Sequence, residues 1–194
     1  MQKHLFLTGP SGCGKTTLIR SILADRLAIA GGFITERIKN EKGEILGYDM
    51  FPAAATVLKD FDGERFLDCS ARPFKADNEV FRNLGVRLLN EAQFYPYAML
   101  DEIGGFELII PQFREALLEV LNNDSLPCIG VIKGKDNSNQ LRKSLGLGDK
   151  YPAYHKALIA ALKADPDTMV LELTRFNRKK AEDTVKRWVE EYVP

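Results

Sequence analysis

Hydrophobic residues follow two different spacings along the chain, and the spacing changes from one segment to the next. Four short segments are almost wholly apolar, which is typical of strands buried on both faces of a sheet. These segments span 5–8, 97–101, 127–132 and 169–173. Elsewhere apolar residues recur at helical intervals of three and four, over 15–30, 77–89, 111–121, 154–163 and 179–192. Strands that alternate with helices predict an α/β fold with a mostly parallel central sheet.

Residues 33–51 interrupt this alternation, because two strand-like segments follow one another there without a helix between them. Only residues 40–43, with the sequence Asn-Glu-Lys-Gly, separate the two segments, and such residues favour a tight turn. The sequence therefore predicts an antiparallel hairpin over 33–51. We expect the preceding helix to end at Gly31 and Gly32, since glycine is common just past a helix C-terminus.

The first strand-like segment leads directly into a glycine-rich segment with the pattern G-x-x-x-x-G-K-[ST]. This segment consists of Gly9, Pro10, Ser11, Gly12, Cys13, Gly14, Lys15, Thr16 and Thr17. Its glycines admit backbone angles that turn successive N–H groups inward, which predicts an anion-binding nest before a helix. In such a phosphate-binding loop, or P-loop, Lys15 reaches the β- and γ-phosphates and Thr16 offers its hydroxyl to Mg²⁺. We therefore expect residues 9–17 to bind a nucleoside triphosphate.

Two adjacent carboxylates, Asp101 and Glu102, stand at the end of the second apolar segment. A P-loop needs a carboxylate at the end of a nearby strand to hold the hydrated Mg²⁺, and Asp101 has that position. Glu102 is then the candidate general base, which would polarise the attacking water. Thr16 and Asp101 are thus the expected metal-binding residues, and Lys15 and Glu102 are the expected catalytic residues.

Two further segments carry candidate residues whose roles have alternatives. Arg142 lies in the polar segment 133–150, where it could close over the phosphates and neutralise charge in the transition state. The alternative for Arg142 is an ordinary solvated loop. Asn177 and Arg178 could contact a nucleotide base or cap the last helix, and we favour the cap.

Composition narrows the classes of function. Among the 194 residues, 27 Lys and Arg balance 27 Asp and Glu, so no net positive field favours nucleic acid or a membrane surface. Cys13, Cys69 and Cys128 form no C-x-x-C pair, which fits a reduced, cytoplasmic setting. No apolar run approaches the ~20 residues that span a bilayer, and no secretory signal pattern is present. A single domain over 1–194 is expected.

Several of these segments resemble one known family. The loop 9–18, the segment 32–35 and the segment 101–108 together look like the small nucleoside-triphosphatases of the thermophilic and cancer-related type. The resemblance continues through 170–174 and 177–178, so it covers almost the whole chain in order. It implies a three-layer, RecA-like P-loop fold and Mg²⁺-dependent hydrolysis of ATP, GTP and other nucleoside triphosphates, with little selectivity for the base.

The same resemblance draws attention to the strand after the first helix. It makes Thr35, Glu36 and Arg37 candidates for a role near the γ-phosphate. The chain departs from the usual family pattern at Arg37 and Lys39, and again at 105–106. The role of Arg37 and Lys39 is therefore left open.

Two alternatives to a hydrolase remain. One is a nucleoside, nucleotide or other small-molecule kinase, which would exclude water and accept a second substrate beside the γ-phosphate. The segment 133–150 contains one arginine, whereas a kinase lid would need several, and this favours the hydrolase. The other alternative is a slow nucleotide-dependent switch that controls a partner protein of unknown identity.

Overall fold

The described strands form one sheet with the order β5-β4-β3-β2-β6-β7-β1-β8. The computed structural model describes residues 1–59, 61–134, 145–146 and 150–194. In chain order the strands are β1 (His4–Thr8), β2 (Ala30–Lys39), β3 (Ile45–Pro52), β4 (Glu64–Asp68), β5 (Lys75–Ala76), β6 (Tyr97–Ile103), β7 (Cys128–Ile132) and β8 (Thr168–Glu172). β7 therefore lies between β1, which leads into the P-loop, and β6, which carries the two adjacent carboxylates.

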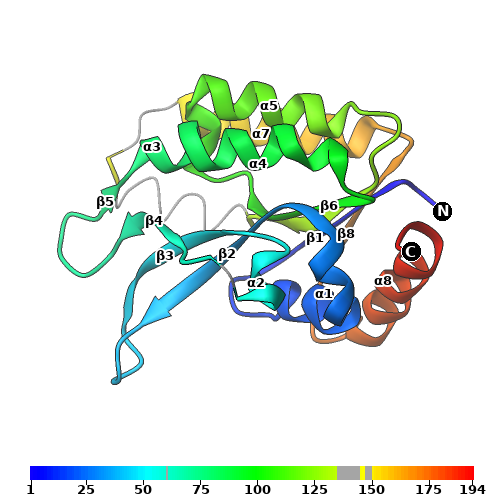
Figure 1. Cartoon of the computed structure of the whole chain (residues 1–194), viewed down its shortest axis with the longest axis horizontal. Helices are drawn as coiled ribbons and strands as arrows, with labels where there is room; N and C mark the ends of the chain where they lie inside the picture. Colours follow the sequence, from blue (N-terminus) through cyan, green and yellow to red (C-terminus); the bar gives the residue numbers. More distant parts are fainter. Residues whose placement is uncertain (60, 135–144, 147–149) are drawn as a thin grey trace.

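Helices cover both faces of this sheet (Figure 1). One layer consists of α3 (Asn78–Val80), α4 (Val86–Glu91), α5 (Pro111–Leu121) and α7 (Lys150–Ala164). The other layer consists of α1 (Lys15–Leu23), α2 (Ala55–Leu58) and α8 (Arg178–Tyr192). The chain also forms short 3₁₀ segments, η1 (Ala24–Ile29), η3 (Ala92–Phe94) and η4 (Phe106–Ile109), and a π-helical segment, η2 (Phe81–Gly85). None of the helices in the described ranges is long and apolar enough to cross a membrane.

Strand direction confirms the predicted α/β fold and its hairpin. β2, β6, β7, β1 and β8 pair in parallel, whereas β3, β4 and β5 are added to one edge in antiparallel pairs. β2 pairs with β6 only over 30–33, and its remaining residues pair with β3. The far half of the hairpin therefore extends beyond the carboxyl end of β6, which is where ligands bind in sheets of this kind.

Alternate residues of the central strands enter two separate hydrophobic cores. Leu5 and Leu7 on β1 pack in the core that contains Trp188 of α8, while Phe6 between them packs in the core that contains Phe113 of α5. This two-residue period explains why β1 is apolar throughout, since both of its faces are covered by helices. The three-layer arrangement fixes the position of the loop that follows β1.

The prediction of one helix over 15–30 is wrong beyond Leu23. Ala24 has a positive φ of 47° with a ψ of −123°, which ends α1, and η1 follows in 3₁₀ geometry. Gly31 and Gly32 do not end a helix but belong to β2. A Cβ atom on Gly32 would lie 2.3 Å from the carbonyl oxygen of Met99, so glycine is needed where β2 approaches β6.

We expect His4 to make the stability of the folded protein depend on pH. This effect does not involve the P-loop. Its imidazole is buried at the start of β1, and its Nδ1 has no hydrogen-bond partner in the described part of the chain. Burial lowers the pKa of His4 to about 4, and nearby Lys3 adds to the shift. Because the neutral imidazole is favoured in the folded state, its contribution to stability is complete above pH 6.5 and is lost as pH falls towards 4.

We therefore expect His4→Phe to reduce the loss of stability in acid. Between pH 7 and 4.5 the free energy of unfolding should fall by about 2 to 3 kcal/mol less in the variant than in the wild type. Urea unfolding at the two pH values measures this difference. Equal losses in both proteins would show that His4 does not carry this acid sensitivity.

Candidate active site

The P-loop lies between β1 and α1, and its backbone is held close to the residue that follows β8. Gly9 has φ of 133°, and a Cβ atom there would lie 2.5 Å from the carbonyl oxygen of Leu173, so a larger residue cannot take its place. Gly14 is the N-cap of α1, and no described side chain caps this helix end. The first N–H groups of α1 are therefore available to an anion, together with the positive end of the helix dipole.

The ammonium of Lys15 folds back onto the loop that precedes it. Its Nζ donates to the carbonyl oxygens of Gly9 at 3.0 Å and Pro10 at 2.9 Å, and only 4% of the residue surface is exposed. No carboxylate of the described residues lies within 4.0 Å of this ammonium. Since neutral carbonyls hold the charge, it can interact with a phosphate without first breaking an ion pair.

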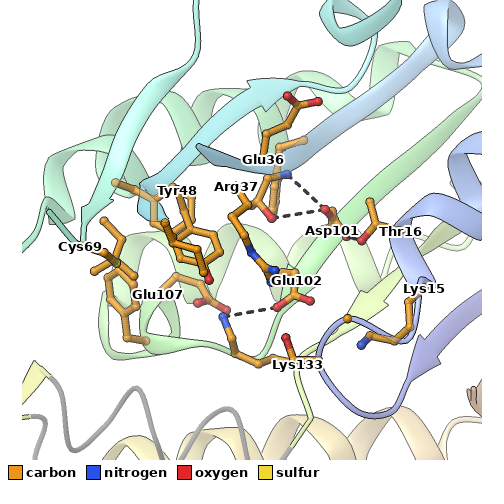
Figure 2. Close-up of a pocket in the computed structure, with 18 of the residues that line it drawn as sticks. Lys15, Thr16, Glu36, Arg37, Tyr48, Cys69, Asp101, Glu102, Glu107 and Lys133 are labelled. Carbon is orange, nitrogen blue, oxygen red and sulfur yellow. Dashed lines mark hydrogen bonds and ion pairs between the residues drawn. The ribbon is translucent and has the colours of Figure 1, made fainter. Parts of the chain in front are cut away.

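A buried carboxylate joins the P-loop helix to two strands. Thr16 Oγ1 donates to Asp101 Oδ1 at 2.7 Å, and the backbone N and the hydroxyl of Thr35 each lie 3.3 Å from Oδ2 (Figure 2). Burial raises the pKa of Asp101 to about 7, the Glu102 carboxylate adds to this shift, and the three hydrogen bonds oppose it. The structure thus brings the two expected metal residues, Thr16 and Asp101, into direct contact and adds Thr35 to them.

These oxygen atoms fit the requirements of Mg²⁺. Two hydroxyls and one carboxylate are the hard ligands that this ion prefers, and it commonly uses one or two carboxylates together with phosphates and water. No described cation lies within 4.0 Å of Asp101, so its raised pKa reflects a buried negative charge that a metal ion would offset. The described residues contain no group of three or more His, Cys, Asp or Glu side chains that could hold a metal ion.

Glu102 has an unusual backbone conformation at the end of β6. Its φ is 59°, in the left-handed region that residues other than glycine rarely adopt, and the pairing register of β6 and β7 shifts next to it. Such backbone strain is concentrated at functional sites, where it fixes the direction of a side chain. The Glu102 side chain is 29% exposed, and its Oε2 lies 3.4 Å from the Nζ of Lys133 (Figure 2).

Lys133 lies between two carboxylates. Burial alone would lower the pKa of Lys133, but the charges of Glu102 and Glu107 outweigh it, so the net shift is upward and the amine stays protonated. Glu107 is buried, and its Oε1 accepts a 2.6 Å hydrogen bond from the N–H of Gly105. Burial raises the pKa of Glu107, against the opposing charge of Lys133. This arrangement fixes the carboxylate of Glu102 beside a cation without burying it.

The remaining candidates on β2, Glu36 and Arg37, each contact a neighbouring side chain. Glu36 forms an ion pair with Arg20 of α1 at 2.7 Å, so another residue already binds its charge. The guanidinium of Arg37 lies over the ring of Tyr48, with 5.7 Å between Cζ and the ring centroid. Arg142 lies outside the described residues, and its role stays a prediction.

The prediction that Asn177 and Arg178 cap the last helix is confirmed only for the position of Asn177, because no described side chain caps this helix end. Asn177 holds the N-cap position of α8, but its Oδ1 accepts a hydrogen bond from the N–H of Thr174 and its Nδ2 donates to the carbonyl of Glu172. Its side chain therefore stabilises the turn before the helix. Arg178 reaches across to the P-loop, where its guanidinium donates to the carbonyl of Cys13 at 3.2 Å.

One cavity of about 980 Å³ runs from the P-loop to the hairpin. Lys15, Thr16, Asp101 and Glu102 line one part of it. The other part, which we call the aromatic chamber, is lined by Tyr48, Phe66, Phe74, Phe81 and Phe106. The sequence did not predict the chamber, because its residues come from two strands, a π-helical segment, a 3₁₀ segment and a loop that share no local pattern. Glu107 and Lys133 stand beside Glu102 in the same cavity.

Cys13 provides a chemical test of the P-loop. Its half-buried Sγ lies 3.9 Å from the ammonium of Lys15, so an N-ethylmaleimide adduct there should block nucleotide binding. Cys128 should not react in the native protein, because it is buried and burial raises the pKa of its thiol to about 12. We expect ATP to slow the inactivation and Cys13→Ser to resist it. Equal inactivation of Cys13→Ser and wild type would show that Cys13 is not the thiol responsible. Resistance of Cys69→Ser would then identify Cys69 as the reactive thiol.

Fold and loop together define a P-loop α/β protein, and comparison with known proteins identifies its family. A family model described as NTPase matches residues 4–186. The human cancer-related nucleoside-triphosphatase is 30% identical over 92% of this chain and 92% of its own length. The nucleoside-triphosphatase THEP1 of Thermofilum pendens is 30% identical over 76% of this chain and 83% of its own. The chain therefore belongs to the NTPase family.

Solved structures of similar proteins have the same fold. The solution structure of a human cancer-related nucleoside triphosphatase aligns with a TM-score of 0.65 at 21% identity, covering 98% of this chain and 99% of that one. The crystal structure of THEP1 from Aquifex aeolicus aligns with a TM-score of 0.63 at 20% identity, covering 94% and 96%. These likenesses confirm the α/β P-loop fold that the sequence predicts.

Proposed function

We propose that this protein hydrolyses nucleoside triphosphates, including ATP and GTP, to the diphosphate and inorganic phosphate in a Mg²⁺-dependent reaction. The names of the NTPase relatives support the activity. The observation that carries the proposal is the hydrogen-bonded group of Thr16, Thr35 and Asp101, which joins the P-loop to the strand that carries Glu102. It brings the P-loop, the oxygens proposed to hold Mg²⁺ and the proposed base to one cavity.

Each residue has a definite task in the proposed reaction. The N–H groups of the P-loop and the ammonium of Lys15 would bind the β- and γ-phosphates and stabilise the charge that develops on their oxygens. Thr16 and Asp101, with Thr35 beside them, would hold Mg²⁺. When bound, this ion neutralises phosphate charge during the transfer.

Glu102 would act on the water. Its carboxylate, directed by the strained backbone, would orient the water and take its proton while the water oxygen bonds to the γ-phosphorus. The bond from that phosphorus to the β–γ bridging oxygen breaks, and the nucleoside diphosphate leaves with the electron pair. Lys133 would hold the carboxylate of Glu102 in place through their ion pair. Catalysis of this kind rests on positioning and electrostatics.

Phosphate release from Mg·ATP in the absence of any acceptor tests the proposal. We expect release that stops when EDTA removes the metal ion, and comparable release from Mg·GTP. Release of inorganic phosphate that needs an added nucleoside or nucleotide would contradict hydrolysis. Tight binding of Mg·ATP without turnover would instead support a nucleotide-dependent switch.

A further inference from the structure

The cavity continues well past the residues that the proposed hydrolysis needs. It also includes the aromatic chamber, whose Tyr48 lies on the far side of Glu102 from Lys15 (Figure 2). Phe81 packs edge-on against Phe66 and Phe106, with ring centroids 5.1 and 5.3 Å apart. These three rings are buried and form a rigid apolar wall. Tyr48 and Phe74 are only partly buried, so their ring surfaces are accessible to a ligand.

The nucleoside triphosphate does not account for this chamber. Lys15 of a P-loop contacts the β- and γ-phosphates, and the residue that activates water lies beside the γ-phosphate. The γ-phosphate is thus the end of the nucleotide that faces Glu102. Figure 2 places Lys15 and Thr16 on one side of Glu102, and Tyr48 on the other. The chamber therefore lies beyond the γ-phosphate, while the nucleoside extends away from it.

Positive charges accompany the aromatic rings. Arg37, Lys39 and Arg72 line the same cavity, and none of them has a carboxylate within 4.0 Å among the described residues. Arg72 lies over the ring of Phe74, with 4.1 Å between Cζ and the ring centroid, just as Arg37 lies over Tyr48. A guanidinium that stacks on a ring still directs its N–H groups outward to an anion. Rings and unpaired cations together favour a planar aromatic molecule that carries an acidic group.

We propose that the aromatic chamber binds a second substrate, a nucleoside monophosphate, whose phosphate accepts the γ-phosphoryl group in place of water. A phosphate oxygen of the acceptor bonds to the γ-phosphorus while the bond to the β–γ bridging oxygen breaks. The electron pair stays with the departing nucleoside diphosphate, so both products are diphosphates. No proton transfer is needed, since a phosphate monoester is largely dianionic at neutral pH. Hydrolysis is then the reaction that occurs when the chamber is empty of acceptor.

This inference rests on the proposed function, because it takes the γ-phosphate to lie between Lys15 and Glu102. The test uses Mg·ATP labelled in the γ-phosphate, with AMP, GMP, CMP or UMP as the acceptor. Labelled diphosphate and labelled inorganic phosphate are measured in the same samples. Adenosine supplies a ring without phosphate, and glucose 6-phosphate supplies a phosphate without an aromatic ring. We expect labelled diphosphate with at least one monophosphate and no transfer to either control.

A second cation–aromatic pair in this chain provides matched control variants. Arg175 lies over Phe176 at 4.8 Å, as Arg72 lies over Phe74, but this pair is exposed and outside the cavity. Arg72→Ala and Phe74→Ala should each raise the ratio of KM for the monophosphate to KM for ATP about tenfold or more. Arg175→Ala and Phe176→Ala should leave that ratio unchanged. The exposed Arg72 can be removed with little effect on packing, so its variant guards against a folding defect in Phe74→Ala.

Three results would overturn the inference. Phosphate release without labelled diphosphate for any monophosphate would leave hydrolysis intact and exclude the second substrate. Competition between the monophosphate and a non-hydrolysable ATP analogue for one site would make the chamber part of the triphosphate site. Equal effects of the chamber variants and their exposed controls would exclude the chamber as the binding site. Absence of both labelled products would instead contradict the proposed function itself.

Discussion

Lys15→Ala should lower the affinity for Mg·ATP about tenfold or more and turnover by on the order of 10²-fold or more. The first effect follows from the loss of charge-assisted hydrogen bonds to phosphate. The second follows from the loss of charge stabilisation that increases in the transition state. Titration with a fluorescent ATP analogue and a continuous phosphate assay measure the two effects separately.

Lys3→Ala is a matched control for this variant. Lys3 is partly buried and, like Lys15, donates to a backbone carbonyl, that of Asn123 at 3.0 Å, but it does not line the cavity. We expect Lys3→Ala to keep wild-type affinity and turnover. Thermal unfolding of both variants separates a local effect from a loss of folded protein. Normal hydrolysis by a folded Lys15→Ala protein would refute the assignment of the P-loop.

Glu102→Gln should still bind Mg·ATP but release phosphate about 10²-fold more slowly or worse, which is the scale of general-base catalysis. Glutamine has nearly the same shape as glutamate, so the variant removes the charge and the base but keeps the packing. It also removes one negative charge from the cavity and the ion pair with Lys133, which then keeps only the carboxylate of Glu107 beside it. Affinity for Mg·ATP is therefore expected to stay the same or rise.

Glu107→Gln separates the two carboxylates beside Lys133. Glu107 is buried and accepts its hydrogen bond from a backbone N–H, which a glutamine oxygen can also accept. We expect this variant to retain most of the turnover. A larger loss of turnover in Glu107→Gln than in Glu102→Gln would identify Glu107 as the general base. Wild-type turnover in both variants would show that neither carboxylate is the base.

The parts of the site that could be predicted from the sequence are those set by local chemistry. The P-loop needs glycines and Lys15 in consecutive order, so its pattern is visible in one short segment. Asp101 could be assigned because it ends an apolar strand, and the observed 2.7 Å contact with Thr16 confirms that the two lie together. The hairpin over 33–51 was recognisable for the same reason, since its turn and both strands are adjacent in the chain.

The features that could not be predicted depend on contacts between distant segments. Glycine is common at helix ends but also permits two strands to pair closely. For Gly32 the second role applies, because β6 lies too close for a side chain, and this contact is not visible in the sequence. The sequence Asn177-Arg178 fits a helix cap, but the proximity of the P-loop draws Arg178 to the carbonyl of Cys13. The left-handed backbone of Glu102 coincides with a shift in the pairing register of β6 and β7, two strands that are distant in the sequence. The aromatic chamber likewise requires the hairpin, β4 and η4 to be packed together.

A single-turnover reaction of the protein with Mg·ATP in water enriched in oxygen-18 tests the central claim most directly. If Glu102 directs water onto the γ-phosphorus, mass spectrometry should find one oxygen-18 atom in each released phosphate and none in the ADP. Omission of Mg²⁺ should prevent the reaction. Oxygen-18 in the ADP would place the attack on the β-phosphorus, and the absence of labelled phosphate without an added acceptor would show that the protein does not use water. Either result would contradict hydrolysis at this site.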